Sequence, residues 1–577
     1  MKEPFLYYFT IIIFALLCHN DHNSLIAQHI CPSLNISVAE GEELKFSTLE
    51  LSLVCEGHGG DDWTHIPMVQ KKNFLTKFLA ERGYYYPTFE EKKGILEVSL
   101  GKMAVVERIE LAEDILNIDP NRLWKIYGKP INSATLDDLE RWILSQYANK
   151  GYPCVKLNTK AYPRKNLVSI MVQNIRKKKF GRVLDQAGPV IRSARRRFDA
   201  FDEGDLFRQK RLLLTQNRLK QKEHILDATL TPICTPSDKV NISQHATETK
   251  PRLVSIGVGF DSDDLLFIEG SWSHSQLFDT ESYLKTKFFL ASNRQLLSSE
   301  LDWYYAPVKT RHHLRSSTTV EHRKNKIFES KGVTANTGPV LDFDKLNHRF
   351  SLWIGPSFEH SQLIIGEGPK VSNSLLFRTH AQVSSENFEL YRDSPNSGYA
   401  VILDISHAQI GLGSLYTGSN YHLLIKSFHN ILNLDPALWV LGLRAGLIGF
   451  SYNEQNVEKI PINAFPRIGG ASTLRGLPFE SIPEVGIKNA IYSGLEIRIN
   501  NIVPFGLAPF TFLDFARVRE TKLGISQEKY ISPGLGVNWN SPIGTLRLYF
   551  SYPAISRNNG DVENLGFKLG LNIGEDF

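Results

Sequence analysis

Residues 251–577 alternate apolar and polar side chains over many short segments separated by turns. Between positions 567 and 574, for example, every second residue is apolar: Phe567, Leu569, Leu571 and Ile573. Beyond Leu17 no run of 18 apolar residues occurs, so a mature chain that crosses a membrane must do so with strands closed into a barrel. Such strands need about 9 to 11 residues, and residues 251–577 accommodate about 16 of them. A soluble sandwich or propeller would explain the alternation equally well.

The N-terminus has the features of a secretory signal. Lys2 precedes the apolar run from Phe5 to Leu17, which is too short to span a bilayer as a helix. We predict a signal peptide over residues 1–27, with cleavage after Ala27. The composition is 42% hydrophobic and 22% charged, which is typical of a folded protein, and the net charge of +5 gives no indication of a nucleic-acid partner.

Residues 28–250 predict a repeated α/β module, divided into residues 28–102, 103–175 and 176–250. Each copy contains a helix followed by two strands, at a period of about 55 to 70 residues. In the first copy the pattern predicts a strand over Ser47–Val54. A helix follows in each copy where apolar residues recur three and four apart. The helices are expected around Phe74–Leu79, from Ser133 to Tyr147, and over Arg208–Leu219.

The chain has five cysteines, too few for a disulfide scaffold. Cys31 and Cys55 flank a strand-like stretch of the first copy. They either form a disulfide in an oxidising compartment or remain as two thiols.

A glycine-rich loop with a single terminal arginine lies between alternating segments near the C-terminus. Its defining residues are Gly469, Gly470, Leu474, Arg475 and Gly476. This run resembles the lid-loop motif of the outer-membrane assembly-factor superfamily that includes the BamA and TamA barrels.

Other segments carry the same resemblance. Arg82-Gly83-Tyr84 and Lys150-Gly151-Tyr152 resemble matching positions of POTRA domains, the β-α-α-β-β modules of that superfamily. The terminal Phe577 resembles the C-terminal signal of outer-membrane barrels. The resemblance implies three POTRA modules in the periplasm, followed by a 16-stranded transmembrane antiparallel β-barrel in the bacterial outer membrane.

The resemblance also implies that Arg475 folds into the barrel lumen and meets carboxylates on nearby strands. Glu496 and Asp514 are the candidates, because each alternates with apolar neighbours that would face lipid. Leu477 stands where the family has an aromatic residue, and Ala516 stands where it has glycine. Both positions predict a local departure from the family's contacts.

Two basic runs, Arg176–Lys179 and Arg192–Arg197, are typical of a solvated face, or alternatively of contact with anionic lipid headgroups. The histidines form no metal-binding spacing, and no serine elbow or phosphate loop is present. We therefore expect no metal, no cofactor and no enzymatic activity.

The resulting prediction is an outer-membrane insertase of the TamA type. Its expected partners are outer-membrane lipid, unfolded barrel or autotransporter substrates, and a TamB-like protein anchored in the inner membrane. The alternative is a two-partner secretion transporter that exports one specific exoprotein. Such transporters typically have two POTRA modules, so the third copy favours the insertase.

Overall fold

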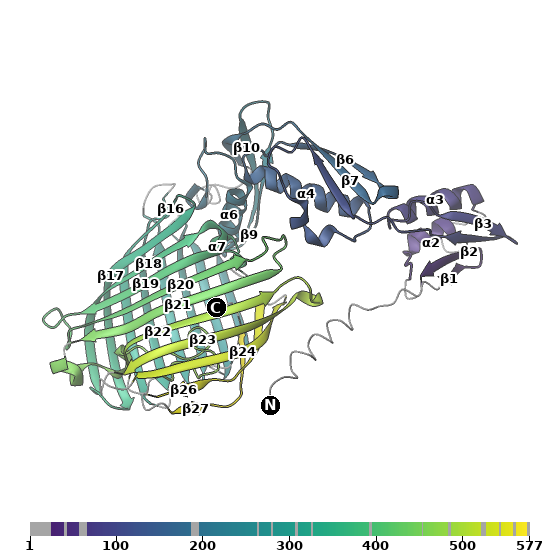
Figure 1. The fold of residues 1–577 in the computed structure, drawn as a ribbon. Helices are drawn as coiled ribbons and strands as arrows, with labels where there is room; N and C mark the ends of the chain where they lie inside the picture. The colour runs from purple at the N-terminus through teal and green to yellow at the C-terminus, as the bar shows by residue number, and fades with distance from the viewer. Residues whose placement is uncertain are drawn as a thin grey trace. The chain divides into compact units, whose positions relative to one another are not determined.

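The fold is described from a computed structural model (Figure 1). The chain separates into two compact units, residues 1–144 with 155–175 and residues 145–154 with 176–577. The structure describes the following ranges: 25–39, 43–56, 66–185, 196–261, 265–277, 281–305, 310–324, 327–391, 395–452, 454–482, 486–520, 527–541, 544–557 and 561–573. Most of the predicted signal peptide and the terminal Phe577 lie outside these ranges.

The first α/β module is a four-stranded sheet covered by two helices. The sheet order is β1-β2-β4-β3. Its elements are β1 (Leu25–Cys31), β2 (Leu34–Ala39), α2 (Thr48–Val54), α3 (Met68–Ala80), β3 (Thr88–Lys92) and β4 (Ile95–Ser99). β1 thus begins at Leu25, within the segment predicted as the signal peptide. The sulfurs of Cys31 and Cys55 are bonded at 2.10 Å.

The predicted strand over Ser47–Val54 is wrong, because this segment forms helix α2. Ser47 and Glu50 form a capping box: Glu50 N–H donates to the Ser47 hydroxyl at 3.3 Å, and Ser47 N–H donates to the Glu50 carboxylate at 2.7 Å. This reciprocal pair satisfies donors that a helix start leaves open. The alternate leucines imitate a strand, but Leu49 is exposed and only Val54 is buried.

The second and third modules each contain a three-stranded sheet. In chain order each module has a strand, a helix and then a β-hairpin. The second has β5 (Arg108–Ala112), α4 (Ser133–Asn149), β6 (Lys156–Tyr162) and β7 (Leu167–Gln173), in the order β5-β7-β6. Two 3-10 turns, Pro120–Arg122 and Trp124–Ile126, lie between β5 and α4. The third has β8 (Lys179–Asp185), α6 (Gln209–Lys220), β9 (Ile225–Ile233) and β10 (Lys239–Glu248), in the order β8-β10-β9.

A second disulfide joins Cys154 to Cys234, with an S–S distance of 2.07 Å. It connects the loop after α4 to the loop between β9 and β10. This pair was not predicted, since the two cysteines are 80 residues apart and no pattern links them.

The remainder of the chain is one antiparallel sheet that runs from β11 to β28 and curls into a barrel (Figure 1). β26 and β27 are strands of three residues each that form a hairpin, and the other sixteen strands of the described ranges form the wall, as predicted. The strands are β11 (Arg252–Asp261), β12 (Leu265–Leu277), β13 (Ser282–Ala291), β14 (Arg294–Trp303), β15 (His313–Lys324), β16 (Glu329–Lys345), β17 (His348–Ile365), β18 (Val371–Ser385), β19 (Gly398–Ala408), β20 (Gly418–Asn430), β21 (Trp439–Tyr452), β22 (Ile487–Ile499), β23 (Leu507–Glu520), β24 (Gln527–Ser541), β25 (Gly544–Ser551), β26 (Ala554–Ser556), β27 (Val562–Asn564) and β28 (Lys568–Ile573).

The alternation of the sequence sets the two faces of the wall. On β22, Ile491 and Leu495 are exposed outward, whereas Tyr492 and Glu496 are buried inward. β11 and β28 stand at the two ends of the sheet order, and β28 pairs with β25. Within the described ranges no backbone ladder joins β11 to β28. The barrel is therefore nearly closed, with a seam between its first and last strands.

Candidate functional site: the loop arginine inside the barrel

The glycine-rich loop lies between β21 and β22. Gly469 has φ +124°, and a Cβ at this position would lie 2.2 Å from the carbonyl oxygen of Pro478. Gly476 has φ +85°, and a Cβ there would lie 2.1 Å from the Ser551 hydroxyl on β25. Both positions therefore require glycine. The two glycines allow the loop to turn sharply and to press against the barrel wall.

Arg475 is the centre of the loop's contact with the wall. Its Nε and Nη2 donate to the two carboxylate oxygens of Asp514, each at 2.8 Å. Its Nη1 donates to Glu496. The guanidinium lies 3.7 Å from the centre of the Phe512 ring, and the Arg475 carbonyl accepts from the Ser532 hydroxyl at 2.6 Å. The structure thus brings together the arginine and both carboxylates that the sequence analysis selected.

Three further arginines complete this lid-loop cluster. Arg498 Nε and Arg547 Nη2 donate to Glu496 at 2.5 and 2.7 Å. Arg444 lies 3.4 Å from Asp514 and donates to the backbone carbonyls of residues 471–473, at distances of 2.7 to 3.2 Å. Charge-assisted bonds of this kind are the strongest that side chains make. We define the lid-loop cluster as Arg444, Arg475, Glu496, Arg498, Asp514 and Arg547.

The lid-loop cluster is shielded from water. Glu496 and Asp514 have no exposed surface, and Arg475 is 2% exposed. Burial alone would lower the pKa of Arg475, but Asp514 and Glu496 outweigh it and raise that pKa. A guanidinium held in this way stays charged and keeps one geometry. Its groups can fix a loop, but none is placed as a nucleophile next to a base.

Leu477 and Ala516, the two residues that depart from the family pattern, are both buried and packed against neighbouring side chains. Leu477 is buried in the cluster that contains Ile468 and Leu474, so the loop tip contributes an aliphatic contact where an aromatic ring was expected. Ala516 is fully buried and lies opposite Tyr492 in the ladder between β22 and β23.

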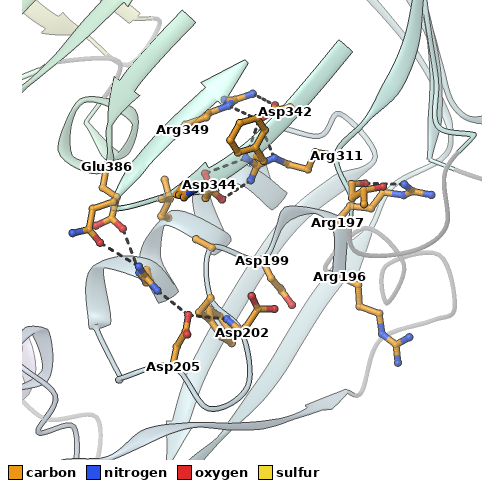
Figure 2. A pocket seen from close by; sticks show the side chains of 18 of the residues that line it. Arg196, Arg197, Asp199, Asp202, Asp205, Arg311, Asp342, Asp344, Arg349 and Glu386 are labelled. Carbon is orange, nitrogen blue, oxygen red and sulfur yellow. Dashed lines mark hydrogen bonds and ion pairs between the residues drawn. The ribbon is translucent and has the colours of Figure 1, made fainter. Parts of the chain in front are cut away.

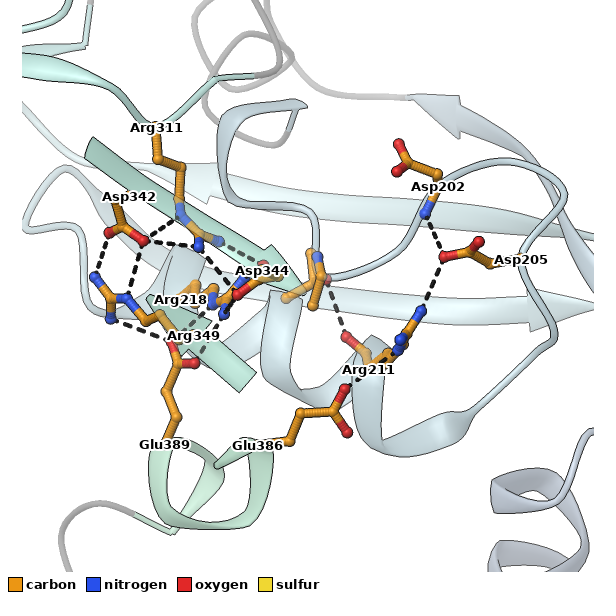
Figure 3. Close-up of polar contacts among 12 residues, drawn as sticks. Asp202, Asp205, Arg211, Arg218, Arg311, Asp342, Asp344, Arg349, Glu386 and Glu389 are labelled. Carbon is orange, nitrogen blue, oxygen red and sulfur yellow. Dashed lines mark hydrogen bonds and ion pairs between the residues drawn. The ribbon is translucent and has the colours of Figure 1, made fainter. Parts of the chain in front are cut away.

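A second charged cluster joins the third module to one end of the barrel wall. Arg218, on α6, donates to Glu389 at 2.8 Å and to Asp344 at 2.7 and 2.9 Å. Glu389 belongs to α7 (Glu386–Leu390), a short helix between β18 and β19. Figure 3 shows Arg218 lying between these two carboxylates. Although burial opposes it, pairing with Glu389 and Asp344 raises the pKa of Arg218.

The same cluster extends along the barrel rim. Arg311 contacts Asp342 at 2.8 Å and Asp344 at 2.8 Å, and Arg349 contacts Asp342 at 2.6 Å. We define the module–barrel cluster as Arg218, Arg311, Asp342, Asp344, Arg349 and Glu389. Beside it, Glu386 accepts from Arg208 at 2.9 Å and from Arg211 at 3.3 Å. A cavity of about 680 Å³ opens next to these groups (Figure 2).

Sequence reasoning missed the module–barrel cluster and three arginines of the lid-loop cluster. Arg498 could have been found, because it follows Glu496 by two residues and so shares its face of β22. No linear signal could have found the pairing of Arg218 with Asp344 and Glu389, which are 126 and 171 residues away. The described ranges contain no helix long and apolar enough to cross a bilayer and no cluster of side chains suited to a metal ion.

Comparison with known families identifies the C-terminal part of the barrel. Residues 391–577, which contain the glycine-rich loop and both carboxylates, match the Omp85 superfamily domain. Residues 391–577 therefore form an Omp85 superfamily domain. The resemblance seen in the sequence is therefore confirmed at the level of the superfamily. No curated protein sequence matches the chain.

Among solved structures, the chain is similar to BamA from Haemophilus ducreyi lacking POTRA domains 1–3, at 16% identity and a TM-score of 0.48. That match covers 81% of this chain and 98% of the other. CdiB from Acinetobacter baumannii is similar at 14% identity and a TM-score of 0.44, covering 92% of this chain and 100% of the other. At these identities neither likeness bears on substrates or partners.

Proposed function

We propose that this protein, whose residues 391–577 match the Omp85 superfamily domain, is an outer-membrane insertase and translocase of the TamA type. Residues 28–102, 103–175 and 176–250 act as three POTRA modules in the periplasm, and residues 251–577 form the outer-membrane barrel. The protein assists the assembly of barrel proteins or autotransporters, with a TamB-like partner at the inner membrane. It uses no cofactor and catalyses no reaction.

The observation that supports this proposal most is the Arg475 contact. A passive pore needs no loop fixed across its interior, yet here the loop is held by buried charge-assisted bonds to two strands. Strand seams and exposed sheet edges support the same proposal. Each α/β sheet ends in edge strands, such as β3, β6 and β9, to which an extended substrate could add a strand. The seam between β11 and β28 would then template that strand into the bilayer.

Depletion of the protein tests this function directly. An insertase predicts that several barrel proteins or autotransporters decrease together in the outer-membrane proteome. Loss of one secreted exoprotein, with the barrels unchanged, would instead support the two-partner secretion transporter. An unchanged outer-membrane and secreted proteome would reject both functions.

The role of Arg475 is tested by complementation of the depleted strain. Arg475→Ala removes the guanidinium that holds the loop, so we expect reduced assembly of substrates or reduced barrel stability. Arg294→Gln is the matched control, because Arg294 also pairs with a carboxylate, Glu321 at 2.8 Å, and both residues of this pair belong to barrel strands. Full activity and full stability of Arg475→Ala would refute the role.

A further inference from the structure

A second arginine of the same loop, Arg467, is buried without a carboxylate. It is 7% exposed. Its Nη1 donates to the backbone carbonyls of Ile462 and Phe465 at 3.2 and 3.3 Å, and its guanidinium lies 5.1 Å from the centre of the Phe328 ring. Its Nε and Nη2 meet no acceptor among the described residues. A buried cation with two open donors is costly unless a partner fills them.

The open edge of Arg467 is the one that other buried arginines of this protein use for carboxylates. Arg475 binds Asp514 through Nε and Nη2, each at 2.8 Å. Arg218 binds Glu389 through the same two atoms, also at 2.8 Å. This edge of a guanidinium matches the two oxygens of an oxyanion. In Arg467 the same edge is free, whereas Nη1 is already anchored to the loop backbone.

Arg467 lines a cavity of about 600 Å³ inside the barrel, between the wall and the loop. Other wall groups also have open polar atoms: Trp353 Nε1, Arg378 Nε and Asn420 Oδ1 have no partner in the described structure. These atoms offer a ligand two further donors and one acceptor.

The carboxylates that line this cavity are already engaged. Glu480 pairs with Arg323, and Asp404 contacts His380 at 2.6 Å. Burial, followed by the charge of Arg323, lowers the pKa of Arg467 to about 10, whereas the carboxylates around Arg475 raise its pKa. Arg467 still carries its charge at neutral pH. The described part of the cavity therefore presents a cation whose counter-charge must come from outside it.

We propose that this cavity is a binding site for an oxyanion group, a carboxylate or a phosphate, held by Nε and Nη2 of Arg467. The oxyanion belongs either to a small free solute or to an acidic side chain of a polypeptide inside the barrel. This site goes beyond the proposed function, because strand assembly by itself requires no ligand in the lumen. It also gives the loop a second anchor, eight positions before Arg475, that depends on the ligand.

The test uses the full chain in detergent micelles and measures the midpoint of thermal unfolding. Sodium chloride is replaced by sodium acetate or sodium phosphate at constant ionic strength. A ligand that binds the folded state raises the midpoint with concentration, so the wild type is expected to respond and Arg467→Gln is expected not to. Because phosphate also stabilises proteins through solvent exclusion, the response of Arg467→Gln provides the baseline.

Two further variants make the result specific. Arg467→Lys keeps the charge but loses the paired donors, so its half-saturating concentration should rise at least about tenfold. It also keeps the test open if Arg467→Gln does not fold. Arg294→Gln removes a charge from a barrel strand outside this cavity and leaves Arg467 intact, so it should retain the wild-type response. Equal responses of wild type and Arg467→Gln, or no response of the wild type, would overturn the proposal.

The source of the oxyanion is separated by a third probe, an end-blocked Gly-Glu-Gly peptide. Saturation by this peptide at a lower concentration than acetate would assign the site to a polypeptide carboxylate. Saturation by acetate or phosphate at an equal or lower concentration would assign it to a small free anion. Both outcomes support the site, provided that Arg467→Gln abolishes the response.

Discussion

The lid-loop cluster and the module–barrel cluster are built from the same chemistry but are balanced differently. In the lid-loop cluster four arginines surround two carboxylates that have no exposed surface. In the module–barrel cluster three arginines face three carboxylates, and the side chains of Asp344 and Arg349 are 32% and 33% exposed. The lid-loop cluster thus has more arginines than carboxylates and is shielded from water. The module–barrel cluster has equal numbers of both and is partly hydrated.

This difference indicates that the two clusters have different structural roles. Excess guanidinium groups in the lid-loop cluster find their remaining acceptors on the loop backbone, where Arg444 binds three consecutive carbonyls. The loop backbone thus supplies acceptors for these arginines. If the loop moved away from the wall, buried guanidinium donors would lose those acceptors. In the module–barrel cluster each cation contacts two carboxylates, and water can replace part of the contacts of Asp344 and Arg349. We therefore expect the loop to be fixed more firmly than the third module.

The largest effect is expected for Glu496→Gln. One amide would replace a carboxylate shared by Arg475, Arg498 and Arg547, which leaves three buried cations with a single acidic partner nearby. Breaking a buried pair costs about 3 to 5 kcal/mol, and we expect the free energy of unfolding in urea to fall by at least that range. Full-length protein in micelles provides the measurement.

Glu359→Gln is the control for this prediction. Glu359 pairs with Arg378, and both side chains are partly exposed, at 26% and 34%. A half-exposed pair contributes about 1 kcal/mol or less. If the two variants lose equal free energy of unfolding, Glu496 stabilises the barrel no more than a partly exposed carboxylate does. The proposed difference between the two clusters would then be wrong.

A smaller and more local effect is expected for Arg218→Met. The substitution leaves Glu389 without its main partner and removes one of the two cations at Asp344. We expect faster amide hydrogen exchange in α6 and α7, because these helices are joined through this contact, and unchanged exchange in residues 469–477. Hydrogen exchange read by mass spectrometry measures both segments in one experiment.

Lys220→Met is the matched control on the same helix. Lys220 contacts Asp227 at 2.6 Å, but the two side chains are 42% and 52% exposed, so the pair should matter little. Increased exchange at residues 469–477 in Arg218→Met would show that the two clusters are energetically coupled, which would contradict their independence.

Salt should distinguish the clusters without any substitution. At 1 M salt the screening length is about 3 Å, so hydrated pairs weaken while fully buried pairs do not. We expect high sodium chloride to increase hydrogen exchange in α7 and to leave the loop at residues 469–477 unchanged. An equal response of both segments would mean that water reaches the lid-loop cluster.

The parts of the fold that follow local rules were predictable from the sequence. Helical spacing located α3, α4 and α6, and strict alternation gave the strands and the inward face of Glu496 and Asp514. The first module shows the limit of this reasoning. Leu49, Leu51 and Leu53 alternate as in a strand, but the capping box of Ser47 with Glu50 and the position of Val54 in the core favour a helix.

The candidate site was only partly predictable, for a physical reason. The resemblance placed Arg475 near two carboxylates, since a loop and its neighbouring strands lie close along the chain. The number of cations on each carboxylate depends on barrel closure, which brings Arg547 of β25 to Glu496 of β22. Contacts between the third module and the barrel depend on docking of distant segments, and no periodicity encodes that docking.

The smallest effect is a pH dependence near the docked end of the third module. His224, in the turn between α6 and β9, is 3% exposed and its Nε2 has no partner. Burial, followed by the charge of Lys222, lowers its pKa from 6.5 to about 4. The unfolded state therefore takes up a proton as the pH falls below about 6.5, whereas the folded state does so only near pH 4.

Stability contributed by neutral His224 is therefore present above pH 6.5 and is lost as the pH falls toward 4. At pH 5 the loss should be about 2 kcal/mol, seen as faster hydrogen exchange in α6 and β9 after correction for intrinsic rates. His224→Gln cannot titrate, so its corrected exchange in these elements should change less between pH 7 and pH 5 than that of the wild type. If both proteins change equally, protonation of His224 does not carry the pH dependence.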